Sequence, residues 1–119
     1  MIINMERQSV SMRDDRKAPN RKSFEVIGSC SLKSFIKILC ESYCPRMYEE
    51  KAVWILWDRH KAIAVFDSIT RECVYLTSRK DIALQDLTKK DDVAEMYLYY
   101  KGKTNIDDVV YELNEELIG

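Results

Sequence analysis

The strongest constraint on the fold is a pair of apolar segments that are separated by a short polar stretch. Residues 52–58 (AVWILWD) are apolar at both alternating sets of positions, and residues 62–67 (AIAVFD) are again apolar almost throughout. A strand that is apolar on both faces belongs in the middle of a sheet or barrel. The polar residues between the two segments supply a turn. We therefore predict a central β-hairpin, followed after a second turn by a third strand at 73–77.

Two other segments have apolar residues at helical spacing. One helix is predicted over 31–44, with Ser31 as its N-cap and Pro45 as the residue that ends it. A second helix is predicted to run from a cap at Thr104 to about residue 117.

Further strands at 23–27 and 93–101 and a short helix beginning at Ser78 complete the order β-α-β-β-β-α-β-α. This order predicts one α+β domain with an antiparallel core over residues 23–119.

The remaining residues differ in composition. Residues 1–22 contain six basic and three acidic residues, few large apolar ones, and a Pro-Asn pair near their end. We interpret them as a flexible basic arm. The end of the chain is acidic instead, with Asp107, Asp108 and Glu112 on the predicted last helix.

The sequence contains few signals of catalysis or metal binding. Its three glycines are too far apart for a phosphate-binding loop, and its paired carboxylates are sequence neighbours that point to different faces. The cysteines Cys40, Cys44 and Cys73 could form a zinc site with His60, but zinc-hairpin spacing is missing. We predict packed, reduced thiols, no metal, no cofactor and no enzymatic activity.

No apolar run reaches the roughly 20 residues that a membrane span needs. The first ten residues (MIINMERQSV) also lack the apolar core of a signal peptide. These features predict a cytoplasmic protein that makes no membrane contact.

Basic turns and aromatic strands remain as candidate binding groups. Cations for phosphate beside flat rings for bases are the combination used to bind single-stranded RNA. We expect the hairpin ends to converge into one basic rim beside the tyrosine strand. The candidate residues are Arg59, Lys61, Arg71, Arg79, Lys101, Lys103, Tyr97 and Tyr99.

Two segments carry a family resemblance: residues 49–66 (EEKAVWILWDRHKAIAVF) and residues 31–44 (SLKSFIKILCESYC). Their order resembles that of the small PrgU-type regulators of plasmid conjugation, whose fold is similar to the PUA domain. The resemblance implies a compact mixed β-barrel with flanking helices. It also implies an RNA-binding regulator, for single-stranded or structured RNA, that limits production of conjugation or surface proteins.

The alternative function is a protein-binding module of the immunity, inhibitor or regulator-partner type. In this interpretation the acidic C-terminal helix and exposed aromatic residues form the contact. A homodimer is a further expectation, because small folds with exposed strands often pair with a second copy.

Overall fold

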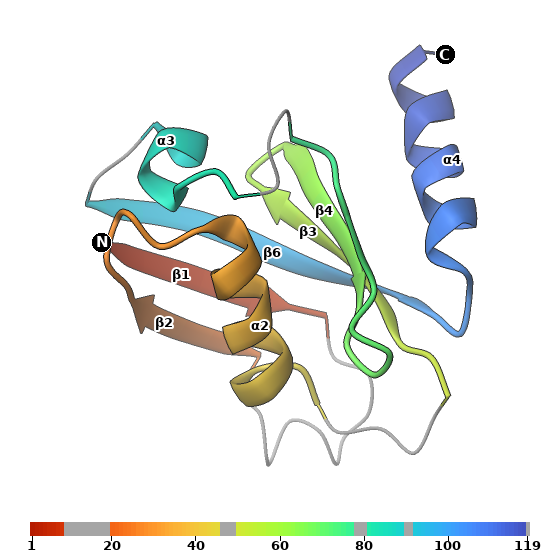
Figure 1. Cartoon of the computed structure of the whole chain (residues 1–119), viewed down its shortest axis with the longest axis horizontal. Helices are drawn as coiled ribbons and strands as arrows, with labels where there is room; N and C mark the ends of the chain where they lie inside the picture. Colours follow the sequence, from red (N-terminus) through yellow and green to blue (C-terminus); the bar gives the residue numbers. More distant parts are fainter. Residues whose placement is uncertain (9–19, 46–49, 78–80, 90–91, 119) are drawn as a thin grey trace.

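The computed structural model describes residues 1–8, 20–45, 50–77, 81–89 and 92–118. Its strands are β1 (Ile2–Arg7), β2 (Arg21–Glu25), β3 (Val53–Asp58), β4 (Lys61–Asp67), β5 (Cys73–Tyr75) and β6 (Val93–Gly102). Its helices are α2 (Leu32–Ser42), α3 (Leu84–Thr88) and α4 (Ile106–Ile118). The strands form one six-stranded sheet in the order β2-β1-β6-β3-β4-β5 (Figure 1). The chain is therefore an α+β domain, as predicted.

The central hairpin is confirmed. β3 pairs antiparallel with β4, so that Trp54 faces Phe66 and Asp58 faces Lys61. On its other side β3 pairs antiparallel with β6. Residues 53–56 are at most 4% exposed, because helices pack on both faces of this part of the sheet. The third strand is shorter than predicted and ends at Tyr75.

The N-terminal residues differ most from the prediction. β1 pairs in parallel with β6 and antiparallel with β2, and it lies inside the sheet. Ile3 and Met5 join the core, and Arg7 is only 2% exposed, with its guanidinium carbon 5.7 Å from the centre of the Tyr43 ring. Two features stabilise this strand: apolar residues at every second position, and backbone hydrogen bonds to β2 and to β6.

The prediction of a flexible arm over residues 1–22 is therefore wrong at both ends of that segment. Ile2–Arg7 is β1, and Arg21 and Lys22 begin β2. The middle of the expected arm, residues 9–19, lies outside the described residues.

The prediction of a closed barrel is also wrong. β2 and β5 are the two outer strands of the sheet, and no pairing joins them. The added strand β1 changes the predicted order to β-β-α-β-β-β-α-β-α. β6 pairs with β1 on one side and with β3 on the other, so β2 and β5 lie at opposite edges of an open sheet.

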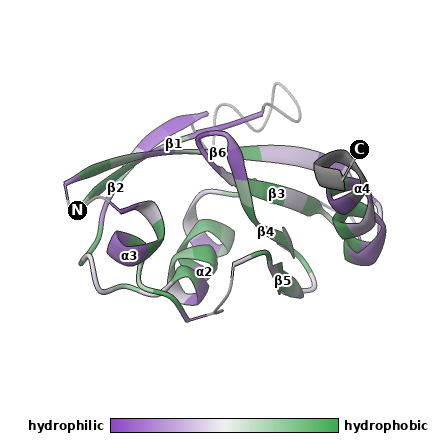
Figure 2. Ribbon diagram, turned by 90° about the horizontal axis from the view of Figure 1, so that it is seen from above, coloured by the Kyte–Doolittle hydropathy of each residue, from purple (hydrophilic) through white to green (hydrophobic). Residues whose placement is uncertain are grey.

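The helices divide unequally between the two faces of the sheet (Figure 2). α2 and α3 cover one face, where the larger core includes Phe35, Leu39 and Trp54. α4 lies on the other face, where Val109 and Leu113 pack on Val53, Ile55 and Val65. These contacts leave most of the β2–β1–β6 half of that second face without a described helix, and the end of β6 at Tyr99 and Lys101 lies beside α4.

The helix ends follow local signals. Ser31 is the N-cap of α2, as predicted, and its hydroxyl accepts a hydrogen bond from the Ser34 amide at 3.1 Å. α4 begins at Ile106, so Asn105 directly precedes it and the predicted cap at Thr104 is one residue too early. α3 begins at Leu84, later than the predicted Ser78, which lies outside the described residues. No described helix has the length and hydropathy that a membrane crossing requires.

Asp67 connects β3 to the turn that follows β4. This buried residue is 2% exposed, and its Oδ1 accepts hydrogen bonds from the amides of Ile69 at 2.8 Å, Thr70 at 3.0 Å and Ala52 at 3.2 Å. One carboxylate oxygen thus satisfies donors on two separate segments. Buried donors that lose such an acceptor are costly.

We expect Asp67→Ala to lower the free energy of unfolding by about 3 kcal/mol, because three amides lose their acceptor. Asp67→Asn keeps an acceptor of similar shape and should cost about 1 kcal/mol. Urea denaturation followed by tryptophan fluorescence measures both. Glu72→Ala, an exposed side chain in the same turn, is the control. Equal stability of Asp67→Ala and the unmodified protein contradicts this role.

Candidate interaction surface

The uncovered half of the sheet presents one ordered set of side chains. Alternate residues of a strand point to the same side, so the strand registers define rows across the sheet. Ser23, Asn4 and Glu95 form one row, and Arg21, Glu6 and Tyr97 form the next. We call this surface the open face. It comprises Ile2, Asn4 and Glu6 of β1, Arg21, Ser23 and Glu25 of β2, Val93, Glu95, Tyr97 and Tyr99 of β6, and Trp57 of β3.

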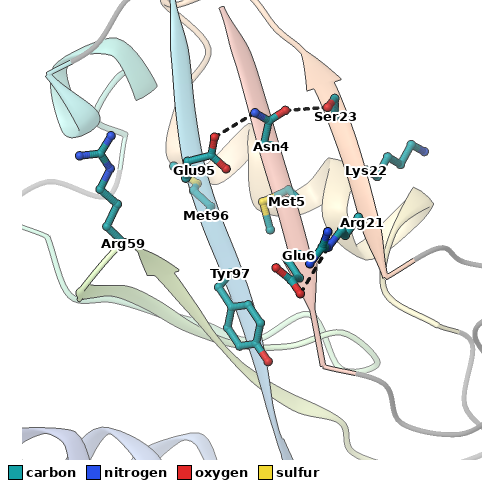
Figure 3. Close-up of a pocket in the computed structure, with 10 residues that line it drawn as sticks. All are labelled: Asn4, Met5, Glu6, Arg21, Lys22, Ser23, Arg59, Glu95, Met96 and Tyr97. Atoms are coloured by element: carbon teal, nitrogen blue, oxygen red, sulfur yellow. Dashed lines mark hydrogen bonds and ion pairs between the residues drawn. The ribbon is translucent and has the colours of Figure 1, made fainter.

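Hydrogen bonds connect the polar side chains across three strands (Figure 3). The Ser23 hydroxyl donates to Asn4 Oδ1 at 2.6 Å, and Asn4 Nδ2 donates to Glu95 Oε1 at 3.0 Å. Arg21 Nε lies 3.5 Å from a Glu6 oxygen. Exposed pairs of this kind add little stability. Their effect is to hold the side chains in defined positions over a shallow depression of about 540 Å³.

α4 forms a wall along one side of the open face. Trp57 and Tyr99 line a groove against Val109 and Leu113 of this helix. An ion pair crosses the groove, with Lys101 Nζ 3.3 Å from Glu112 Oε2.

The tyrosines of β6 extend the open face toward this wall. Tyr99 is 43% exposed, and Lys101 Nζ lies 5.9 Å from the centre of its ring. Partial burial, and then the nearby Glu6 carboxylate, raise the pKa of Tyr97, which therefore remains a neutral hydroxyl donor. The surface thus combines hydrogen-bonding groups with partly exposed rings.

The structure divides the predicted cations between two ends of the sheet. Arg59 and Lys61 lie at the β3–β4 turn, and Arg59 lines the depression of the open face. Arg71 lies beyond the opposite end of β4, near the end of β6 that carries Lys101 and Lys103. Arg79 lies outside the described residues. Arg59 and Lys61 are therefore not brought together with Arg71, Lys101 and Lys103 in one basic rim, although Arg59 shares the depression with Arg21 and Lys22. Of the predicted residues, Tyr97, Tyr99 and Lys101 do lie close together.

Sequence reasoning missed β1, predicted β2 only in part as a strand at 23–27, and assigned no residue of either strand to a site. Asn4, Glu6, Arg21 and Ser23 fell within or next to the expected arm. The available signal was the alternation of buried Ile3 and Met5 with polar neighbours, which is the period of a half-buried strand. Buried Arg7 interrupts that pattern, because its residue type is normally exposed.

The cysteines lie on the opposite side of the sheet, in and around the larger core. The Cys44 thiol donates to Cys40, which lowers the pKa of Cys40 and raises that of Cys44. Burial raises the pKa of Cys73 to about 11. The zinc site considered above is not assembled: His60 lies in the exposed β3–β4 turn, whereas Cys73 faces Phe66 at the other end of β4. Among the described residues, no group of three metal-ligating side chains converges.

We expect iodoacetamide to modify Cys40 about tenfold faster than Cys73 at mildly alkaline pH, because the thiolate is the reactive form. Mass spectrometry of peptides from a time course measures both rates. Cys44→Ala removes the donor and should slow Cys40, while Cys30→Ala should leave it unchanged. Faster modification of Cys73 would contradict the assigned pKa directions.

Comparisons with known proteins add no relatives: no family model, no curated protein and no solved structure matches this chain. The resemblance to PrgU-type regulators, drawn from residues 31–44 and 49–66, therefore stays a prediction. A functional hypothesis for this protein depends on the geometry of the open face and of α4.

Proposed function

We propose that this protein is a non-enzymatic protein-binding module, and that the open face and the adjoining wall of α4 are its docking surface. One observation carries the proposal: half of a sheet face is left without a described helix, yet its polar side chains are held in place across three strands. Ordered side chains lose less conformational entropy on binding. Tyr and Trp beside this surface are residue types that are enriched in protein interfaces.

The charges favour a partner with basic residues. Glu6, Glu25 and Glu95 are exposed on the open face, and the exposed part of α4 adds further acids. Arg21, Lys22 and Arg59 line the same depression, but Arg21 is paired with Glu6, whereas Glu25 and Glu95 make no ion pair with any described residue. We therefore infer a protein partner that carries lysine or arginine side chains around its contact.

The groove between α4 and the sheet supports an apolar anchor at the centre of that contact. Trp57 and Tyr99 form its floor, and Val109 and Leu113 form its wall. A side chain inserted here would be surrounded by apolar surface, and charged residues lie around it, including Glu112. A desolvated centre with a polar rim is the usual anatomy of a protein interface.

RNA binding is a second candidate, and the rings of Trp57, Tyr97 and Tyr99 favour it. They lie on neighbouring strands of an uncovered sheet face, where unpaired bases could stack. The exposed carboxylates of the open face oppose a phosphate backbone, however, and the predicted cations lie at two ends of the sheet. We therefore place the protein partner first.

The docking surface can be located by photo-crosslinking in the native host. We expect a benzophenone amino acid in place of Tyr97 to give one abundant protein adduct. The same amino acid in place of Lys33, on the exposed side of α2, should not give it. Mass spectrometry identifies the adduct. Equal yields of the adduct from both positions contradict the proposed surface.

Binding of the purified partner provides the quantitative test. Glu95→Lys should raise Kd at least about tenfold, or about 1.4 kcal/mol, because a carboxylate facing a basic partner becomes a cation. Lys33→Glu is a matched charge reversal on α2 and should leave Kd unchanged. Isothermal titration calorimetry measures both variants.

A salt series tests the RNA candidate. We expect fluorescence anisotropy with a single-stranded RNA to show no saturable binding below millimolar concentration at low salt. Tight binding that weakens with salt, by roughly 0.7 in log–log slope for each phosphate contact, would favour RNA instead. In that outcome Tyr99→Ala should weaken binding, because stacking on this exposed ring is lost.

A further inference from the structure

β2 is an outer strand whose free edge is still able to pair. The amide of Arg7 donates to the Asn20 carbonyl at 2.8 Å, and the amide of Val26 donates to the Met1 carbonyl at 2.9 Å. Even-numbered residues of this segment therefore direct their backbone groups toward β1. The backbone groups of the odd-numbered residues Arg21, Ser23 and Glu25 point away from the sheet. Within the described parts of the chain, no hydrogen bond to these outward groups is found.

The side chains of β2 complement a second copy of the same strand. In an antiparallel pair centred on Ser23, Arg21 faces Glu25 of the second copy, and Glu25 faces its Arg21. Facing side chains lie about 5 Å apart, so each Arg21, whose Nε lies 3.5 Å from Glu6 of its own chain, can also pair with Glu25 of the second copy on the open face. Lys22 faces Phe24 on the other side of the sheet, and within one chain Lys22 Nζ already lies 5.0 Å from the Phe24 ring centre.

We propose that the protein forms a two-fold symmetric homodimer in which β2 pairs antiparallel with β2 of a second copy. The facing pairs are Arg21 with Glu25, Ser23 with Ser23, and Glu25 with Arg21. All of these are the outward-pointing residues, so each facing pair exchanges two backbone hydrogen bonds. The dimer joins two six-stranded sheets into one and places both open faces on the same side.

Other pairings of this edge are less favourable. A parallel pair in register places Arg21 beside Arg21 and Glu25 beside Glu25. A shift of two residues separates the ion pairs and places either Lys22 opposite Lys22 or Phe24 opposite Phe24. The other outer strand, β5, has three residues and offers a shorter edge. The charges of Arg21 and Glu25, and the greater length of β2 compared with β5, therefore favour the antiparallel β2 pair.

The decisive experiment mixes two charge variants. Arg21→Glu leaves β2 with two acids at the facing positions, and Glu25→Arg leaves it with two cations. Sedimentation equilibrium should show a dimer for the unmodified chain, and a dissociation constant at least about tenfold higher for each variant alone. An equimolar mixture should recover the dimer, as a heterodimer, because the charges become complementary again. Fluorescence energy transfer between differently labelled variants identifies that heterodimer.

A backbone variant tests the hydrogen bonds separately. Ser23→Pro removes an outward amide that β1 does not use, so the monomer should fold while the dimer is lost. Thermal melting by circular dichroism checks the fold of every variant, and Lys33→Glu on α2 is the charge control. A monomeric unmodified chain overturns the proposal, as does a dimer that persists in Ser23→Pro and in both charge variants. Neither result bears on the partner of the open face, since sedimentation of the purified protein does not involve that partner.

Discussion

The structure depends on the insertion of β6 between β1 and β3. This strand pairs in parallel with the first strand of the chain and antiparallel with the first strand of the central hairpin. It therefore joins the N-terminal hairpin to the β3–β4–β5 meander in a single sheet. These pairs join residues far apart in the chain, so formation of the sheet closes long loops and costs chain entropy. Burial of apolar side chains in the assembled core offsets that cost.

A consequence of this width is the unequal covering of the two faces. α2 and α3 are enough to cover one face, but α4 covers only the part formed by β3, β4 and β5, together with the end of β6 at Tyr99 and Lys101. The remaining half of the second face is exposed to solvent. Apart from Ile2 and Val93, its side chains are polar or aromatic, and such a surface does not need a covering helix. Cross-strand hydrogen bonds from Asn4 hold these side chains in place.

The charges of this surface, more than its rings, separate the two functional hypotheses. Stacked rings serve RNA and protein partners equally well, since both use flat aromatic surface. Carboxylates at Glu6 and Glu95 do not serve both, because they repel phosphates and attract lysine and arginine. Arg21 and Glu25 on the free edge of β2 likewise favour one arrangement of a second copy of the chain, in which the two β2 strands are antiparallel and centred on Ser23.

Much of the local structure could be predicted from the sequence. The hairpin of β3 and β4, the cap of α2 at Ser31 and the strand β6 follow from apolar period, turn residues and capping groups, which act over a few neighbouring residues. β1 was not recognised in the same way, because Arg7, which is buried beside the Tyr43 ring, interrupts the apolar alternation of Ile3 and Met5.

The candidate site was predicted only in part. Tyr97 and Tyr99 were identified as exposed rings on a strand, and both belong to the open face. Their polar neighbours Asn4 and Ser23 come from the other end of the chain, and only strand pairing brings them there.

The sequence alone thus determined the strands and helices whose signals are local, and it determined which side chains are apolar or charged. The tertiary structure decided the strand order, the open sheet in place of a barrel, the separation of Arg59 and Lys61 from Arg71, and the half-face without a described helix. These features depend on which distant strands pair and on how far each helix reaches across the sheet, and no short stretch of sequence carries that information.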